Sequence, residues 1–115
     1  MIGTIRRGAA KLTLALALFS PQVSSAETTT ADFLTWERSA QDSFIQTSLS
    51  MTGVLVSQVR PEMAKCLDSW YFESKAKQDI RHSEILDVMP QYAEFDPQAV
   101  LLGYIESVCG RIDGS

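Results

Sequence analysis

The chain has 115 residues, of which 45% are apolar, 9% aromatic and 21% charged, and its formal net charge at pH 7 is −4. This length suits one small domain, and the apolar fraction is too high for an intrinsically disordered chain. No apolar run approaches the roughly 18 residues that cross a bilayer as a helix. We therefore expect a single folded, soluble domain.

The first 26 residues have the pattern of a secretory signal peptide. The segment contains three basic residues, Arg6, Arg7 and Lys11. An apolar stretch of eight residues, Leu12–Phe19, follows, and Ser24-Ser25-Ala26 provides the small residues of a cleavage site. A core helix or a membrane anchor is the alternative, but eight apolar residues are too few to span a bilayer. We expect cleavage after Ala26, export to the periplasm or the medium, and one mature domain over 27–115 without a membrane anchor.

Cleavage makes the mature chain more acidic, because residues 1–26 contain three bases and no acids. The mature chain then contains seven basic and 14 acidic residues, which gives a net charge of −7. Nucleic acids and anionic membranes require clustered Lys and Arg, so neither is an expected partner. A cationic partner remains compatible with this charge.

The mature chain contains two cysteines, Cys66 and Cys109. An even count in a small exported chain predicts a disulfide, and with two cysteines the pairing is determined. The closed loop of about 44 residues would stabilise the fold by roughly 4 kcal/mol.

The first half of the mature chain predicts two helices. Thr30 is a candidate N-cap for a short helix that continues to Trp36. Ser39 is a candidate cap for a long, largely buried helix over 40–59, although periodicity alone also allows a strand at 54–56. Three small residues in this helix, at i, i+3 and i+7, would let another helix approach closely, either within the chain or in a homodimer. They are Ser50, Gly53 and Ser57.

The second half predicts two or three more helices. Pro61 begins a helix that continues to Phe72, with its inward face formed by Met63, Cys66, Leu67 and Trp70. The polar segment 73–81 predicts a solvated connection, and Ser83 is a candidate cap for a helix over 84–89. Asp96-Pro97 combines an N-cap carboxylate with proline at the first helical position and begins the last helix, which ends at Cys109. The predicted fold is all-α, a compact bundle of four or five short helices closed by one disulfide.

The sequence offers little catalytic or metal-binding chemistry. His82 is the only histidine and stands in a polar segment, so we expect a solvated imidazole. Asp79, His82 and Glu84 are too few and too loosely spaced for a metal site. No nucleophile, phosphate-binding or dinucleotide-binding motif is present. We predict no catalytic, cofactor-binding or metal-binding residue, and therefore a protein that is not an enzyme.

Three consecutive aromatic residues, Trp70-Tyr71-Phe72, are the most informative local feature. Side chains on consecutive helical positions point about 100° apart, so the three cannot all enter one core from one side. We expect Trp70 inside, and Tyr71 or Phe72 partly exposed as an anchor for a partner protein. The alternative is a bundle that covers this helix on both sides and buries all three.

The order of these features resembles a known family. The features are an export signal, the pentapeptide Thr30–Leu34, a long apolar helix, Cys66, an apolar stripe over Ile85–Tyr92, Pro97 and a final helix that ends in Cys109. This order, over residues 30–110, is similar to the Rap1a/Tai family of exported immunity proteins. The cysteine of that pattern near the first helix is absent here, and Trp36 stands in that neighbourhood. The resemblance implies a periplasmic protein that blocks a cell-wall-degrading effector with a surface patch.

A looser resemblance connects the chain with the HdeA-type acid-stress chaperones, which are small, helical and periplasmic and have one disulfide. Protonation of the carboxylates would change the mature charge from −7 to about +9, and self-repulsion would favour an opened state. We therefore hold two functions open. The first is an exported non-catalytic protein-binding domain of the immunity or inhibitor type, and the alternative is an acid-stress chaperone that binds client proteins.

Overall fold

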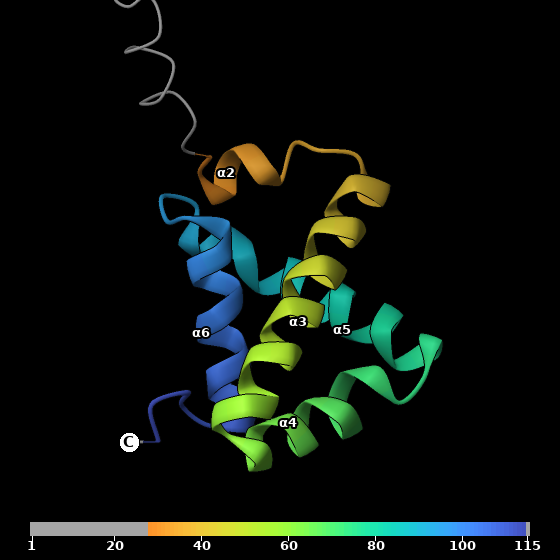
Figure 1. The fold of residues 1–115 in the computed structure, drawn as a ribbon. Coiled ribbons are helices and arrows are strands. Elements are labelled where there is room, and N and C mark those ends of the chain that lie inside the picture. Colours follow the sequence, from red (N-terminus) through yellow and green to blue (C-terminus); the bar gives the residue numbers. More distant parts are fainter. Residues whose placement is uncertain (1–27, 115) are drawn as a thin grey trace, which may run out of the picture.

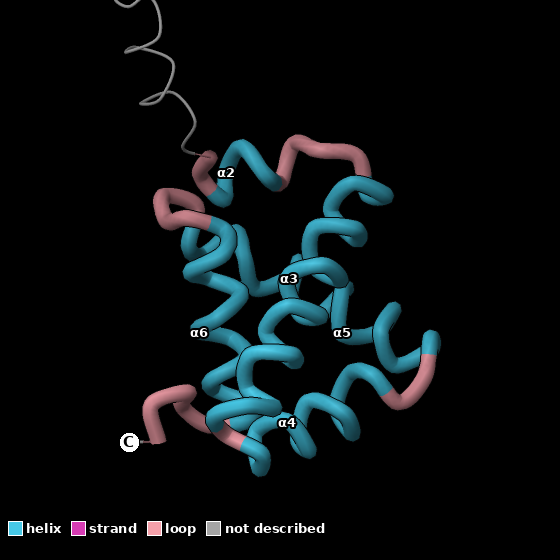
Figure 2. Tube along the Cα trace, viewed as in Figure 1, coloured by secondary structure: helices cyan, strands magenta, loops and turns pink. Residues whose placement is uncertain are grey.

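The computed structural model describes residues 28–114, so the predicted signal peptide lies outside the described residues. This part of the chain is an all-α bundle of five α-helices, as predicted (Figures 1 and 2). The α-helices are α2 (Thr30–Phe33), α3 (Arg38–Val59), α4 (Pro61–Leu67), α5 (Lys75–Val88) and α6 (Pro97–Cys109). A π-helical turn, η1 (Asp68–Phe72), follows α4, and a 3-10 turn, η2 (Met89–Tyr92), follows α5. Residues 54–56 belong to α3, which excludes the alternative strand.

The core forms where α3 and α6 meet the other helices. In Figure 1, α3 runs from the top right to the lower left, α6 lies to its left, and α2 closes the top of the bundle. Every one of these helices and turns contributes at least one buried apolar side chain. The core consists of Phe33, Ile45, Leu49, Val56, Met63, Leu67, Tyr71, Ile85, Met89, Leu101 and Ile105.

Two helix starts agree with the local chemistry of the sequence. Pro61 occupies the first position of α4, where its missing N–H costs no hydrogen bond. At the start of α6 the Asp96 carboxylate accepts a hydrogen bond from the backbone N–H of Gln98 at 2.7 Å, and Pro97 follows at the first helical position. At the other end of α6, Gly110 has a φ of 96°, a left-handed conformation that glycine adopts without strain.

The predicted disulfide joins Cys66 of α4 to Cys109 of α6, with the two Cα atoms 5.6 Å apart. It therefore connects the middle of the chain to its last helix. The cross-link closes a loop with a sequence separation of 43 residues and limits the freedom of the unfolded chain.

The prediction of a solvated connection over 73–81 was wrong, because α5 extends from Lys75 to Val88. Its cap is Ser74, whose hydroxyl accepts a hydrogen bond from the backbone N–H of Lys77 at 3.1 Å, and Ser83 lies inside the helix. Ion pairs between residues four apart, such as Lys75–Asp79 at 2.8 Å, stabilise this polar surface. Helix α5 forms with few apolar residues because only two of its side chains, His82 and Ile85, are buried.

The first two helices also begin earlier than predicted, and the first is shorter. Thr29, not Thr30, caps α2: its hydroxyl accepts from the backbone N–H of Asp32, whose carboxylate accepts from the Thr29 N–H. Thr30 is buried instead, and its hydroxyl donates to the Phe95 carbonyl at 2.8 Å. Helix α3 begins at Arg38 without a side-chain cap, so Ser39 lies within it.

The small residues of α3 serve a contact inside the chain. A Cβ atom on Gly53 would lie 3.3 Å from Cε2 of Phe72, so the ring packs closely against the glycine. Ser50 and Ser57 line the same shallow depression beside Phe72. This contact is the close approach that the spacing predicted, made by an aromatic side chain of η1.

Candidate functional site

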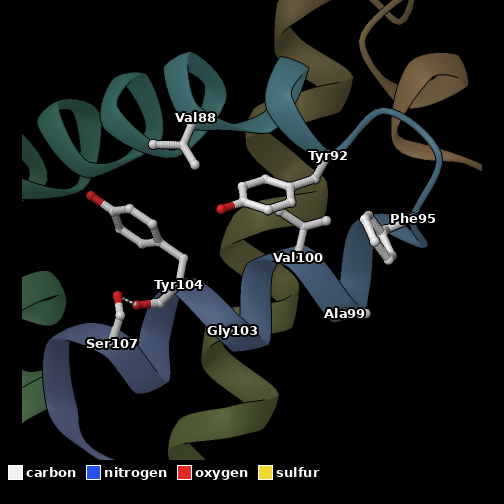
Figure 3. A pocket seen from close by; sticks show the side chains of 8 residues that line it. All are labelled: Val88, Tyr92, Phe95, Ala99, Val100, Gly103, Tyr104 and Ser107. Atoms are coloured by element: carbon white, nitrogen blue, oxygen red, sulfur yellow. Dashed lines mark hydrogen bonds between the residues drawn. The ribbon is translucent and has the colours of Figure 1, made fainter.

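An apolar groove of about 400 Å³ lies between α6 and the segment formed by the end of α5, η2 and the loop after it (Figure 3). It is open at the surface. Its lining residues are Val88, Tyr92, Phe95, Ala99, Val100, Gly103, Tyr104 and Ser107. A cavity of this size holds a drug-sized molecule or a few side chains of a partner.

The loop at one end of the groove is fixed by α2. The backbone N–H of Thr30 donates to the Phe95 carbonyl at 2.8 Å, and that of Ala31 donates to the Ala93 carbonyl at 2.9 Å. The Phe95 backbone is therefore tied down, whereas its side chain remains 58% exposed. Tyr92, with its ring centroid 6.1 Å from that of Phe95, is 42% exposed. The structure thus presents two aromatic side chains to solvent, one at the end of η2 and one on the loop that follows it.

Three of the five α6 residues that line the groove have small side chains. Ala99, Gly103 and Ser107 recur every four residues and therefore share one face of the helix. All three are exposed, and a Cβ atom on Gly103 would meet nothing within 4 Å. Glycine inside a helix costs about 1 kcal/mol relative to alanine, so the open space at Gly103 is not a stabilising feature of the fold.

Two tyrosine hydroxyls are the main polar groups of the groove. Figure 3 shows the rings of Tyr92 and Tyr104 on its two sides, with both hydroxyls toward the end that lies below Val88. Burial raises the pKa of Tyr104, and the nearby Glu84 carboxylate adds to this effect, so the phenol stays protonated at neutral pH and is a hydrogen-bond donor. Tyr104 also packs on Trp70, with ring centroids 6.0 Å apart.

The aromatic run 70–72 is arranged differently from the prediction. Tyr71 has no exposed surface, Phe72 is half-buried against Gly53, and Trp70 is partly buried between Tyr104 and Arg81. Tyr71 points into the core in place of Trp70 because residues 68–72 form a π-helical turn. This turn is wider than an α-helical one and shifts the inward-facing position to a later residue. Tyr71, expected as a possible partner anchor, thus lies in the core, and Phe72 keeps partial exposure.

The expectation that His82 is a solvated surface side chain was wrong, because it is only 5% exposed. Its Nε2 atom lies 2.7 Å from the Tyr71 hydroxyl and its Nδ1 atom 3.0 Å from Oδ1 of Asp42. In the neutral ring with its proton on Nδ1, Tyr71 donates to Nε2 and Nδ1–H donates to Asp42. Burial raises the pKa of Tyr71 to about 12, which keeps that hydroxyl protonated. The three side chains connect α3, η1 and α5.

The Asp42–His82–Tyr71 chain has the order of a catalytic relay but lacks access. No surface of Tyr71 is exposed, so a substrate atom does not reach its hydroxyl in this structure. Over residues 28–114, no group of three or more His, Cys, Asp or Glu side chains is placed to hold a metal ion. None of the helices in this range is long and apolar enough to cross a membrane.

Sequence reasoning missed the groove because Tyr92 was assigned to an inward stripe and Phe95 was not considered. Phe95 stands directly before the helix start at Asp96-Pro97, in the connection between two helices, and connecting segments lie at the surface.

Comparisons with known proteins do not assign the chain to a family. No protein-family model, no curated protein and no solved structure matches it.

Proposed function

We propose that the mature chain is an exported, non-catalytic protein-binding domain of the immunity or inhibitor type, which acts on a secreted or cell-wall-directed effector. The observation that carries the proposal is the groove beside α6, with its exposed aromatic residues Tyr92 and Phe95. Exposed aromatic side chains beside a depression are typical anchors of protein interfaces.

Further support comes from the sequence and the disulfide. The signal-peptide pattern of residues 1–26 and the Cys66–Cys109 bridge both fit a chain that works in an oxidising compartment outside the cytoplasm. The resemblance of the sequence layout over residues 30–110 to the Rap1a/Tai family is a further reason to propose an inhibitory role. The loop at the groove is held by hydrogen bonds to α2, so little ordering entropy opposes binding there.

The test is affinity capture with the oxidised protein and with Gly103→Leu, from extracts of the cells that produce it. The substituted side chain would extend into the groove from an exposed helical position where a Cβ atom meets nothing, so the variant should fold. Gly103→Ala is the matched control, because it adds one methyl group at the same position. We expect one protein in stoichiometric amount with the native chain and with Gly103→Ala, and its loss with Gly103→Leu. Equal capture by all three would refute the groove as the binding surface.

An acid-stress chaperone is the second candidate, and the Asp42–His82–Tyr71 chain, in which His82 and Tyr71 are buried, favours it. This chain joins three segments of the bundle through an ionised, partly exposed carboxylate, so protonation of Asp42 at low pH weakens its contact with the buried His82. Circular dichroism with a hydrophobic dye from pH 7 to pH 2 distinguishes the two functions. Reversible opening of the fold with dye binding at low pH would support the chaperone function. A protein that stays folded and binds no dye at pH 2 would exclude that function.

A further inference from the structure

The groove lies in a strongly acidic part of the chain. Residues 83–110 contain five carboxylates and no Lys or Arg. Each carboxylate adjoins a lining residue in the chain or lies one helical turn from it, and together they are Glu84, Asp87, Glu94, Asp96 and Glu106. The seven Lys and Arg residues of 27–115 all lie outside this stretch of the sequence.

Not all of these carboxylates are neutralised within the molecule. Glu84 pairs with Arg81 at 3.2 Å, the Asp96 carboxylate caps α6, and Glu106 accepts from the backbone N–H of Ile112 at 3.0 Å. Asp87 and Glu94 are exposed and form no ion pair with Lys or Arg within residues 28–114. Arg81, the base whose charge reaches Tyr104 of the lining, is paired with Glu84, so a cation that approaches the groove meets the charges of Asp87 and Glu94, which are not part of any ion pair with Lys or Arg within residues 28–114.

The shape of the groove favours a helix as the occupant. Small side chains at Ala99, Gly103 and Ser107 extend along about two turns of α6, roughly 12 Å. Small residues four apart let a second helix approach closely, and the exposed rings of Tyr92 and Phe95 would cover its flank. The mainly apolar lining requires an apolar stripe on that helix.

We propose that the groove binds a basic amphipathic helix of the partner protein, with its apolar stripe against α6 and its Lys and Arg side chains toward Asp87 and Glu94. This inference rests on the proposed function and specifies the partner segment. Apolar contacts supply the affinity, and the charges accelerate association and select against acidic segments.

The experiment is selection of random 16-residue peptides displayed on phage against the purified, oxidised protein, followed by affinity measurement on Gly103→Leu. Peptides that lose at least about tenfold in affinity for Gly103→Leu bind in the groove. We expect these peptides to have a net positive charge and apolar residues spaced i, i+3, i+4 and i+7, and to become helical on binding. Neutral, acidic or extended groove-dependent peptides would overturn the inference.

A charge-matched pair of double variants tests the role of the carboxylates. Asp87→Asn with Glu94→Gln should weaken the groove-dependent peptides roughly fivefold at low salt and reduce the salt dependence of association. Glu37→Gln with Glu62→Gln removes the same charge from exposed positions outside the lining and should change affinity less than about twofold. Equal effects of the two pairs would overturn the charge argument.

The outcomes separate this inference from the proposed function. If a protein captured in a groove-dependent manner binds through a segment that is not basic and helical, the function stands and the inference fails. If no peptide and no protein depends on Gly103, both fail. Sedimentation of the native protein and Gly103→Leu tests a second copy as occupant: a dimer that dissociates in the variant would assign the groove to self-association and overturn the inference.

Discussion

His82 holds three segments of the bundle together through hydrogen bonds to side chains 11 and 40 residues away. Its ring is also stacked on the Tyr71 ring, with centroids 5.6 Å apart. A buried polar side chain is tolerated only when its hydrogen bonds are made, because an unsatisfied buried donor or acceptor costs about 1–3 kcal/mol. The Asp42–His82–Tyr71 chain satisfies both ring nitrogens.

Tyr71→Phe should lower the free energy of unfolding by about 1–3 kcal/mol, because Nε2 of His82 would lose its partner in the interior. Tyr104→Phe is the matched control, since it removes the same hydroxyl from the groove, and we expect a change within about 0.5 kcal/mol. Urea unfolding at pH 7 measures both. Equal losses would show that the Tyr71 hydroxyl has no special role.

Asp42 should make the stability depend on pH in the acid range. Burial alone would raise the pKa of this carboxyl, but hydrogen bonds from Arg38 and His82 outweigh it and hold the pKa below its ordinary value of 3.8. A carboxyl with a lowered folded-state pKa stabilises the fold above the unfolded-state value and loses this contribution as the pH falls through the folded-state pKa.

The free energies of unfolding of the native protein and Asp42→Asn should therefore differ most near neutral pH. Their difference should begin to shrink as the pH falls below about 3.8, where the unfolded-state carboxyl becomes protonated, and should be smallest below the lowered pKa of the folded-state carboxyl. Urea unfolding at several pH values between 7 and 2.5 measures the difference. A constant gap over that range would contradict this assignment.

At the scale of helices, α3 and α6 use glycine for opposite purposes. Gly53 makes room for Phe72, whereas Gly103 leaves open space in the groove. A glycine that makes room for a neighbour stabilises the fold, and one in open space weakens its helix. Gly103 weakens α6 without making room for any neighbour within the described residues. This cost to stability supports a binding role for the α6 face.

The same substitution at the two glycines should therefore have different effects. Gly103→Ala should raise the free energy of unfolding by up to about 1 kcal/mol through helix propensity. Gly53→Ala should gain less, because the Phe72 ring must move by a few tenths of an ångström, and Gly53→Val should destabilise by about 1–3 kcal/mol. Thermal unfolding measures the stability of the three variants and gives their order. A stabilising Gly53→Val would contradict the packing argument.

Helix starts that depend on adjacent residues were predictable from the sequence. Pro61 and the pair Asp96-Pro97 act within one turn, so their effect is local. The inward position of Tyr71 was not predictable, because a wider turn at η1 shifts the helical periodicity. His82 was misjudged for a related reason: its polar neighbours in sequence face away, and its partners come from other segments. The groove depends on how α6 lies beside η2, which no local pattern specifies.

At the scale of the whole molecule, the disulfide supplements a small core. A domain as small as residues 28–114 buries little apolar surface. The bridge joins α4 to the C-terminal end of α6 and so attaches the last helix to the middle of the chain.

Replacing both cysteines, Cys66→Ala with Cys109→Ala, should lower the free energy of unfolding by about 4 kcal/mol in the chain-entropy account. Urea unfolding of the oxidised protein and the double variant measures the difference, with the reduced native protein as a check that side-chain volume is not the cause. Equal stability of oxidised and reduced protein would contradict this role of the bridge.

The measurement that tests the binding account most directly is site-specific photocrosslinking in the producing cells. Benzoylphenylalanine would replace Phe95 at the groove and, as the control, Ile80, which is 52% exposed on α5 and does not line the groove. We predict one defined protein adduct from position 95 that is absent from position 80. No adduct at position 95, or the same adducts at both positions, would contradict the assignment of the groove as the binding surface.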